Sequence, residues 1–103
     1  MADITVQELK QRMDAGDNDF VFIDVRESHE YAEFNLGAEL IPLGQIMAAT
    51  DTQLADLKEK EIILHCRSGA RSGQAKQLLE MMGFKHVRNM LGGVLAWQDA
   101  FGK

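Results

Sequence analysis

The sequence contains only one cysteine, one proline, one tryptophan and one tyrosine, and it has no long apolar run. A single cysteine excludes an internal disulfide and a thiol-rich zinc site. No window approaches the roughly 20 apolar residues that cross a bilayer. Basic residues are also few, because eleven Lys and Arg stand against sixteen Asp and Glu and give a formal charge of −5. We therefore expect no metal site, no membrane contact and no nucleic acid among the partners.

The remaining composition is that of an ordinary globular protein. Apolar residues make up 46% and charged residues 26% of the 103 residues. A chain of this length and composition folds around one hydrophobic core, so we expect a single domain over residues 1–103. The first residues lack the basic and apolar regions of a secretory signal, and we expect a cytoplasmic protein.

The apolar pattern predicts an alternation of helices and buried strands. Thr5 and Glu8 have the spacing of a capping box, so we expect a helix over residues 6–15. The apolar runs at 20–25 and 61–65 do not alternate with polar residues, which is typical of strands buried on both faces. We therefore expect an α/β domain with a mostly parallel sheet and helices on both faces. Weaker patterns predict helices at 29–34 (capped by Ser28), 45–49, 52–57, 75–82 and 94–101, and strands at 40–41 and 85–90.

Cys66 lies between the strand at 61–65 and the helix that follows it. Parallel sheets bind ligands beyond the carboxyl ends of their strands, which is where this cysteine falls. Unpaired amides at a helix start favour an anion, and Arg67 and Arg71 add positive charge, so the pKa of the thiol is expected to be low. Gly69 allows a positive φ in the loop. The pattern predicts a nucleophilic thiolate instead of an inert buried thiol.

The residue count of this loop separates two kinds of cysteine site. Tyrosine and low-molecular-weight phosphatases have five residues between the cysteine and an arginine, followed by Ser or Thr. Here only four residues, 67–70, separate Cys66 from Arg71. The smaller loop leaves space for a thiolate with one extra sulfur more readily than for a phosphoryl group, so a phosphatase is the poorer hypothesis. Ser72, the next residue, is expected to cap the following helix.

Four segments together resemble the rhodanese family of sulfurtransferases, whose six-residue active-site loop begins with the catalytic cysteine. They span most of the chain in the order that the family has. The segment Glu33-Phe34-Asn35-Leu36-Gly37 departs from the commoner Gly-His-Ile form and resembles a variant in rhodanese modules linked to activating enzymes of ubiquitin-like sulfur carriers. The four segments are Phe22-Ile23-Asp24-Val25-Arg26-Glu27 with Glu30-Tyr31, Gly37-Ala38 with Ile41-Pro42, the loop 66–71, and Leu91-Gly92-Gly93-Val94-Leu95-Ala96-Trp97.

This resemblance implies a rhodanese-like fold with a five-stranded, mostly parallel sheet. It also implies that Cys66 takes a sulfane sulfur from thiosulfate or a similar anionic donor and becomes a persulfide. A thiophilic acceptor such as cyanide, a thiol or a sulfur-carrier protein then removes the sulfur, and no metal or organic cofactor takes part. The alternative is a persulfide-relay or docking module that acts on a partner protein with little turnover of small molecules.

The resemblance further implies that the loop amides stabilise both the thiolate and the persulfide of Cys66. Arg67 is expected to bind the anionic donor. His65, the last residue of the strand, is expected to be a core histidine and not a general base. The expected substrate-binding residues are Arg67, Ser68, Gly69, Ala70 and Arg71.

Two arrangements of Arg71 remain open from the sequence. Its guanidinium either faces the substrate or pairs inward with Asp24, Glu27 or Glu30. In the resembling family, Asp24 and Arg26 belong to a scaffold of ion pairs near the loop, so we expect a structural role for both.

Overall fold

The computed structural model describes residues 1–103, and its centre is a sheet of four parallel strands. The order of the strands across the sheet is β2-β1-β3-β4, and each neighbouring pair is parallel. All carboxyl ends therefore lie at one edge, where β3 delivers Cys66. The strands are β1 (Val21–Asp24), β2 (Glu39–Leu40), β3 (Glu61–His65) and β4 (His86–Asn89).

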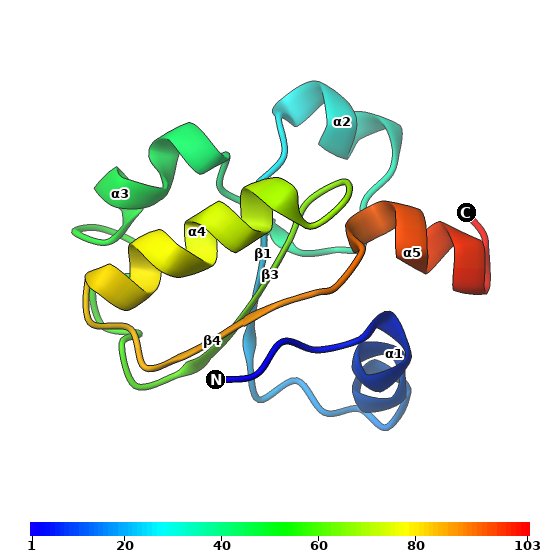
Figure 1. Ribbon diagram of the computed structural model, residues 1–103, viewed down its shortest axis with the longest axis horizontal. Helices are drawn as coiled ribbons and strands as arrows, with labels where there is room; N and C mark the ends of the chain where they lie inside the picture. The colour runs from blue at the N-terminus through cyan, green and yellow to red at the C-terminus, as the bar shows by residue number, and fades with distance from the viewer.

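Helices cover both faces of the sheet, as expected (Figure 1). On one face α3 (Ile46–Ala49) packs against α4 (Ala70–Met81), and α4 also contacts β3 and β4. On the other face α1 (Val6–Asp14) packs against α5 (Gly93–Phe101). The short helix α2 (Ser28–Glu33) and the 3-10 turn η1 (Leu43–Gln45) complete the chain. No helix is both long enough and apolar enough to span a membrane.

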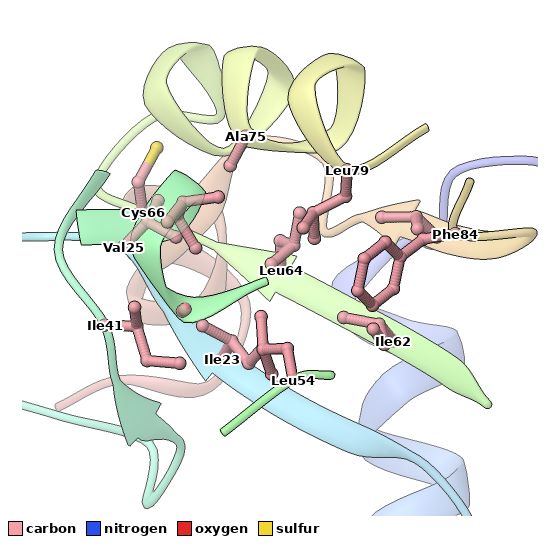
Figure 2. Close-up of a cluster of buried hydrophobic side chains, with 13 residues drawn as sticks. Ile23, Val25, Ile41, Leu54, Ile62, Leu64, Cys66, Ala75, Leu79 and Phe84 are labelled. Atoms are coloured by element: carbon pink, nitrogen blue, oxygen red, sulfur yellow. The ribbon is translucent and has the colours of Figure 1, made fainter. Parts of the chain in front are cut away.

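The two faces have separate apolar cores because successive strand residues point to opposite sides. Figure 2 shows the larger core, in which Ile23 and Leu64 from the sheet meet Ala75 and Leu79 from α4. Cys66 is part of this cluster. The smaller core lies under α1 and α5 and consists of Ile4, Val6, Leu9, Ile63 and Met90.

The sheet has four strands and not the five that were expected. The segment before α1 pairs beside β4 only as an isolated parallel bridge between Ile4 and Met90. Thr5 is already the N-cap of α1, so the chain turns into the helix after a single paired residue. That segment is too short to form a fifth strand.

The local predictions agree with the structure where capping and burial act together. Thr5 and Glu8 form the expected capping box, and β3 has the expected bounds. The N-cap of α2 is Glu27, which forms a capping box with Glu30, and not Ser28 as expected. The helix expected at 52–57 is absent, and residues 51–56 form turns. Thr and Asp side chains compete for backbone partners, and here the hydroxyl of Thr52 donates to the Ala48 carbonyl.

Candidate active site

Cys66 begins the loop between β3 and α4, and its side chain is buried beside the larger apolar core. Gly69 ends the loop as the N-cap of α4 with φ +103°, the positive value expected from the sequence. Gly69 has no side chain, so α4 has no side-chain cap. Ser72, expected to be the cap, lies instead within the first turn of α4, where its hydroxyl faces the sulfur of Cys66.

The start of α5 fixes the direction of the loop. The amides of Val94 and Leu95 donate to the carbonyls of Cys66 and Arg67 at 2.9 and 3.0 Å. These amides have no partner inside their own helix, so the loop acts as the cap of α5. In a trans peptide group the N–H points away from the C=O. The carbonyls of Cys66 and Arg67 point toward α5, so the N–H groups of the same two peptides, which belong to Arg67 and Ser68, point away from α5.

Gly93 makes this close approach possible. A Cβ at this residue would lie 2.5 Å from the carbonyl oxygens of both Cys66 and Arg67, and the φ of Gly93 is +60°. Gly93 is therefore the contact point between α5 and the Cys66 loop.

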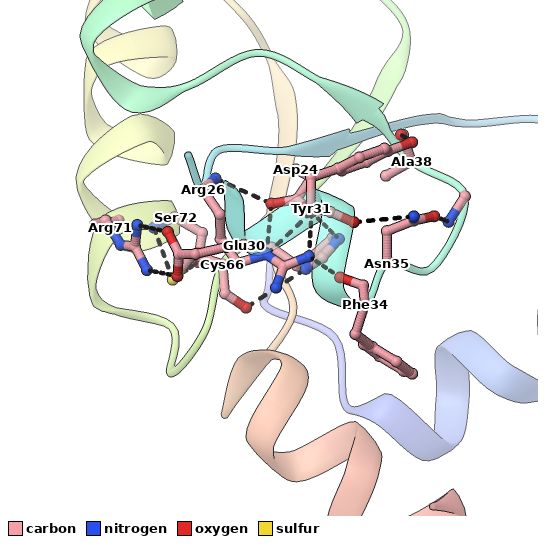
Figure 3. A network of polar contacts seen from close by, with 12 residues as sticks. Asp24, Arg26, Glu30, Tyr31, Phe34, Asn35, Ala38, Cys66, Arg71 and Ser72 are labelled. Atoms are coloured by element: carbon pink, nitrogen blue, oxygen red, sulfur yellow. Dashed lines mark hydrogen bonds and ion pairs between the residues drawn. The ribbon is translucent and has the colours of Figure 1, made fainter. Parts of the chain in front are cut away.

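Three donors surround the sulfur of Cys66, and two of them come from Ser72, which lies beside Cys66 in Figure 3. The amides of Gly69 and Ser72 lie 3.1 and 3.4 Å from Sγ, and the Ser72 hydroxyl lies 3.3 Å from it. Burial raises the pKa of the thiol, but the three donors from Ser72 and Gly69, together with the nearby amide of Ser68, outweigh it, so the pKa lies below its ordinary value. The loop therefore favours the thiolate.

Three further backbone amides of the loop region are unpaired. The amides of Arg67, Ala70 and Arg71 have no acceptor within the chain. Free amides at the start of a helix are suited to bind an anion. The same loop can therefore stabilise negative charge on a second atom attached to Sγ.

Ser72 and Asn89 form a polar pair behind the sulfur that the sequence did not predict. The Ser72 Oγ lies 2.6 Å from the Asn89 Oδ1, and the Asn89 amide nitrogen donates to the Gly69 carbonyl at 3.1 Å. Asn89 is the last residue of β4, which lies far from the loop in sequence, and the fold brings the two together. Its one signal in the sequence is its place at the end of a strand, the edge where ligands bind.

Arg71 pairs with Glu30, one of its two open arrangements. The guanidinium donates to both carboxylate oxygens at 2.7 and 2.9 Å. These bonds from Arg71 lower the pKa of Glu30 to about 2, and the same contact with Glu30 raises the pKa of Arg71. The charge of Arg71 is thus largely neutralised by α2.

Asp24 and Arg26 form a buried ion pair at the end of β1. The Arg26 Nη2 lies 2.8 Å from the Asp24 Oδ2 and also donates to the Phe34 carbonyl at 2.6 Å. This contact fixes the segment after α2 against the sheet (Figure 3). His65 is fully buried against the Phe22 ring, and burial lowers its pKa, so the imidazole stays neutral.

A cleft of about 390 Å³ opens beside the loop. Arg67 lines it, is exposed, and makes no ion pair or side-chain hydrogen bond within the chain. It is therefore free to meet an anion that approaches Cys66. The other lining residues are Arg26, Glu30, Glu33, Phe34, Val94, Leu95, Gln98 and Lys103.

Comparison with known proteins gives consistent results. The family model of the rhodanese-like domain matches residues 5–100. A sulfurtransferase of Allochromatium vinosum is 31% identical over 92% of this chain and 86% of that protein. The thiosulfate sulfurtransferase PspE of Escherichia coli is 38% identical over 69% of this chain and 68% of its own length.

Solved structures share the same fold. A rhodanese-like domain of the Anabaena protein Alr3790 superposes with a TM-score of 0.84 at 27% identity, over 97% of this chain and 75% of that one. A Rhodopseudomonas palustris protein of unknown function, described as a possible tyrosine phosphatase, gives a TM-score of 0.87 at 25% identity, over 100% of this chain and 83% of that one.

We expect Gly93→Ala to lower the free energy of unfolding by at least about 3 kcal/mol, because its Cβ collides with two backbone carbonyls. Gly16→Ala is the matched control, since Gly16 has φ +77° but open space around its Cβ position. That change costs about 1 kcal/mol of backbone strain alone. Urea unfolding of both variants measures the difference, and equal losses would contradict the contact.

The pair between Glu30 and Arg71 predicts a pH dependence of stability. The pKa of Glu30 is about 2 in the folded state, below its ordinary value of 4.5. Its contribution is therefore complete above about pH 4.5 and is lost as the pH falls toward 2. We expect the stability difference between the wild type and Glu30→Gln to shrink over this range in urea unfolding. A constant difference would contradict the pairing.

Proposed function

Because this chain belongs to the family of rhodanese-like domains, whose relatives include sulfurtransferases, we propose that it transfers a sulfane sulfur through Cys66. The donor is thiosulfate or a similar anion, and the acceptor is cyanide, a thiol or a carrier protein. The observation that carries the proposal is the sulfur of Cys66 at the carboxyl edge of a parallel sheet, surrounded by three hydrogen-bond donors.

The proposed reaction has two displacements. The Cys66 thiolate attacks the outer sulfur of thiosulfate, the sulfur–sulfur bond of the donor breaks, and sulfite leaves with the electron pair. This leaves a persulfide on Cys66, with the negative charge on its outer sulfur. The acceptor then attacks that outer sulfur, the bond to Sγ breaks, and the electron pair returns to Sγ as the thiolate.

The loop residues have separate tasks in this proposal. Ser68, Gly69 and Ala70 act through backbone amides, which stabilise an anion in both states of the cycle. Arg67 binds the donor, because it is the one residue of the loop that lines the cleft and its guanidinium has no carboxylate partner. Arg71 keeps the loop against α2 through its ion pair with Glu30.

A phosphatase is the competing activity, and the Rhodopseudomonas palustris structure makes it worth testing. The loop argues against it, because four residues separate Cys66 from Arg71 and the buried Sγ already accepts hydrogen bonds from Gly69 and Ser72. The smaller loop leaves space for one extra sulfur on Sγ more readily than for a phosphoryl group with three equatorial oxygens.

We expect the protein to produce thiocyanate from thiosulfate and cyanide, and Cys66→Ala to abolish this activity. Mass spectrometry of the intact protein after thiosulfate treatment should find one added sulfur atom, since Cys66 is the single cysteine. The absence of thiocyanate above the Cys66→Ala control would refute the proposal. Sulfur loading with very slow release to cyanide would favour relay to a partner protein, and hydrolysis of p-nitrophenyl phosphate that depends on Cys66 would favour a phosphatase.

Arg67→Ala is expected to raise the KM for thiosulfate about tenfold, because one charge-assisted contact is worth about 1.4 kcal/mol or more. The free energy of unfolding should not change, since Arg67 is exposed and has no partner. Lys58→Ala is the matched control, as Lys58 is an exposed cation that does not line the cleft. Equal KM values for both variants would remove Arg67 from the donor site.

A further inference from the structure

The hydroxyl of Ser72 has two acceptors within reach and only one proton. Its Oγ lies 3.3 Å from the Cys66 Sγ and 2.6 Å from the Asn89 Oδ1. A hydroxyl donates one hydrogen bond at a time. Ser72 is fully buried and Asn89 nearly so. The hydroxyl therefore donates its proton either to the Cys66 Sγ or to the Asn89 Oδ1.

The orientation of Asn89 makes it an acceptor toward Ser72. Its Nδ2 donates to the Gly69 carbonyl at 3.1 Å. A carbonyl oxygen cannot donate, so the reversed amide would place two acceptors against each other. The Oδ1 is therefore fixed against Ser72, and it competes with the sulfur of Cys66 for the hydroxyl proton.

The charge on Sγ decides this competition. The inference rests on the sulfur-transfer cycle proposed above, in which Sγ carries the full charge as a thiolate and is the neutral inner atom of the persulfide. A hydrogen bond to a charged acceptor is stronger than one to a neutral acceptor. We propose that the Ser72 hydroxyl donates to Sγ in the thiolate and turns to Asn89 in the persulfide, which makes Ser72 a further catalytic residue and Asn89 its positioning residue.

This alternation favours discharge of the persulfide. When the acceptor attacks the outer sulfur, the electron pair of the breaking bond moves onto Sγ, and the Ser72 hydroxyl turns back to stabilise it as the leaving thiolate. The transfer of sulfur from the donor to Cys66 depends less on this hydrogen bond. The bond raises the fraction of Cys66 that is thiolate, but it lowers the nucleophilicity of that thiolate. Ser72 therefore acts mainly on the second half of the cycle.

The other charged or titratable groups near Cys66 do not replace this hydroxyl. Arg71 is held by Glu30, and Arg67 is exposed at the cleft. His65 is buried against Phe22, and its Nδ1 faces the Cys66 carbonyl at 3.4 Å instead of the sulfur. None of these side chains forms a hydrogen bond to Sγ, so changes at Ser72 and Asn89 report on the hydroxyl itself.

Titration of the thiol tests the competition without any sulfur transfer. The rate of alkylation by iodoacetamide against pH gives the pKa of Cys66 alone, because the chain has one cysteine. Ser72→Ala should raise this pKa by about one unit, since a donor to the thiolate is lost. Asn89→Leu should lower it, since the competing acceptor is lost, and Ser28→Ala, outside the loop, should leave it unchanged.

Single-turnover kinetics test the consequence for the cycle. Protein loaded with thiosulfate is separated from excess donor and mixed with cyanide, and thiocyanate is followed. Ser72→Ala should slow this discharge about tenfold, the rate equivalent of about 1.4 kcal/mol, while loading changes less than about threefold. Asn89→Leu should not slow discharge.

The opposite signs of the two pKa shifts are the essential result. If Asn89→Leu leaves the pKa unchanged or raises it as Ser72→Ala does, Asn89 only supports the loop and the proposal is wrong. Unchanged pKa and discharge in Ser72→Ala overturn it as well. Asn89→Ala takes the place of the leucine variant should that fail to fold. A wild type that never loads sulfur refutes the proposed function, whereas the thiol titration still decides the hydrogen bond.

Discussion

The contact between the start of α5 and the Cys66 loop is the constraint on which the site depends. Two amides of α5 have no partner in their own helix, and two carbonyls of the loop satisfy them. Because peptide groups are planar, fixing the carbonyls on one side fixes amides on the other. The direction of the loop is thus set by the capping requirement of a helix that begins 27 residues after Cys66. Gly93 is needed there because no side chain fits between the two segments.

Burial and hydrogen bonding act in opposite directions on the sulfur. Cys66 is one of the residues of the larger apolar core, and such burial opposes charge on a thiol. The loop amides and the Ser72 hydroxyl overcome that effect because they are fixed by the fold before any substrate arrives. The apolar side also keeps Sγ in place, so the thiolate faces its donors without additional ordering.

The sequence predicted those parts of the protein whose cause is local. The capping box at Thr5, the buried strand before Cys66 and the positive φ of Gly69 depend on neighbouring residues, and the structure confirms all three. The contacts of Gly93 and Asn89 with the loop depend on packing between segments more than 15 residues apart. No periodicity records such contacts, so the sequence indicated neither. The expected fifth strand failed because Thr5, correctly predicted as a cap, ends the pairing after Ile4.

The ion pairs around the loop determine which charges remain unpaired there in this acidic chain. A net charge of −5 repels anions, but salt largely screens this repulsion at distances beyond about 10 Å at 0.1 M ionic strength. Near the loop, Glu30 is paired with Arg71 and Asp24 with Arg26, so two of the carboxylates closest to Cys66 are neutralised. Arg67 has no such partner. Pairing of Glu30 and Asp24 therefore leaves Arg67 as the cation of the loop that has no carboxylate partner, and it lies at the cleft beside the loop.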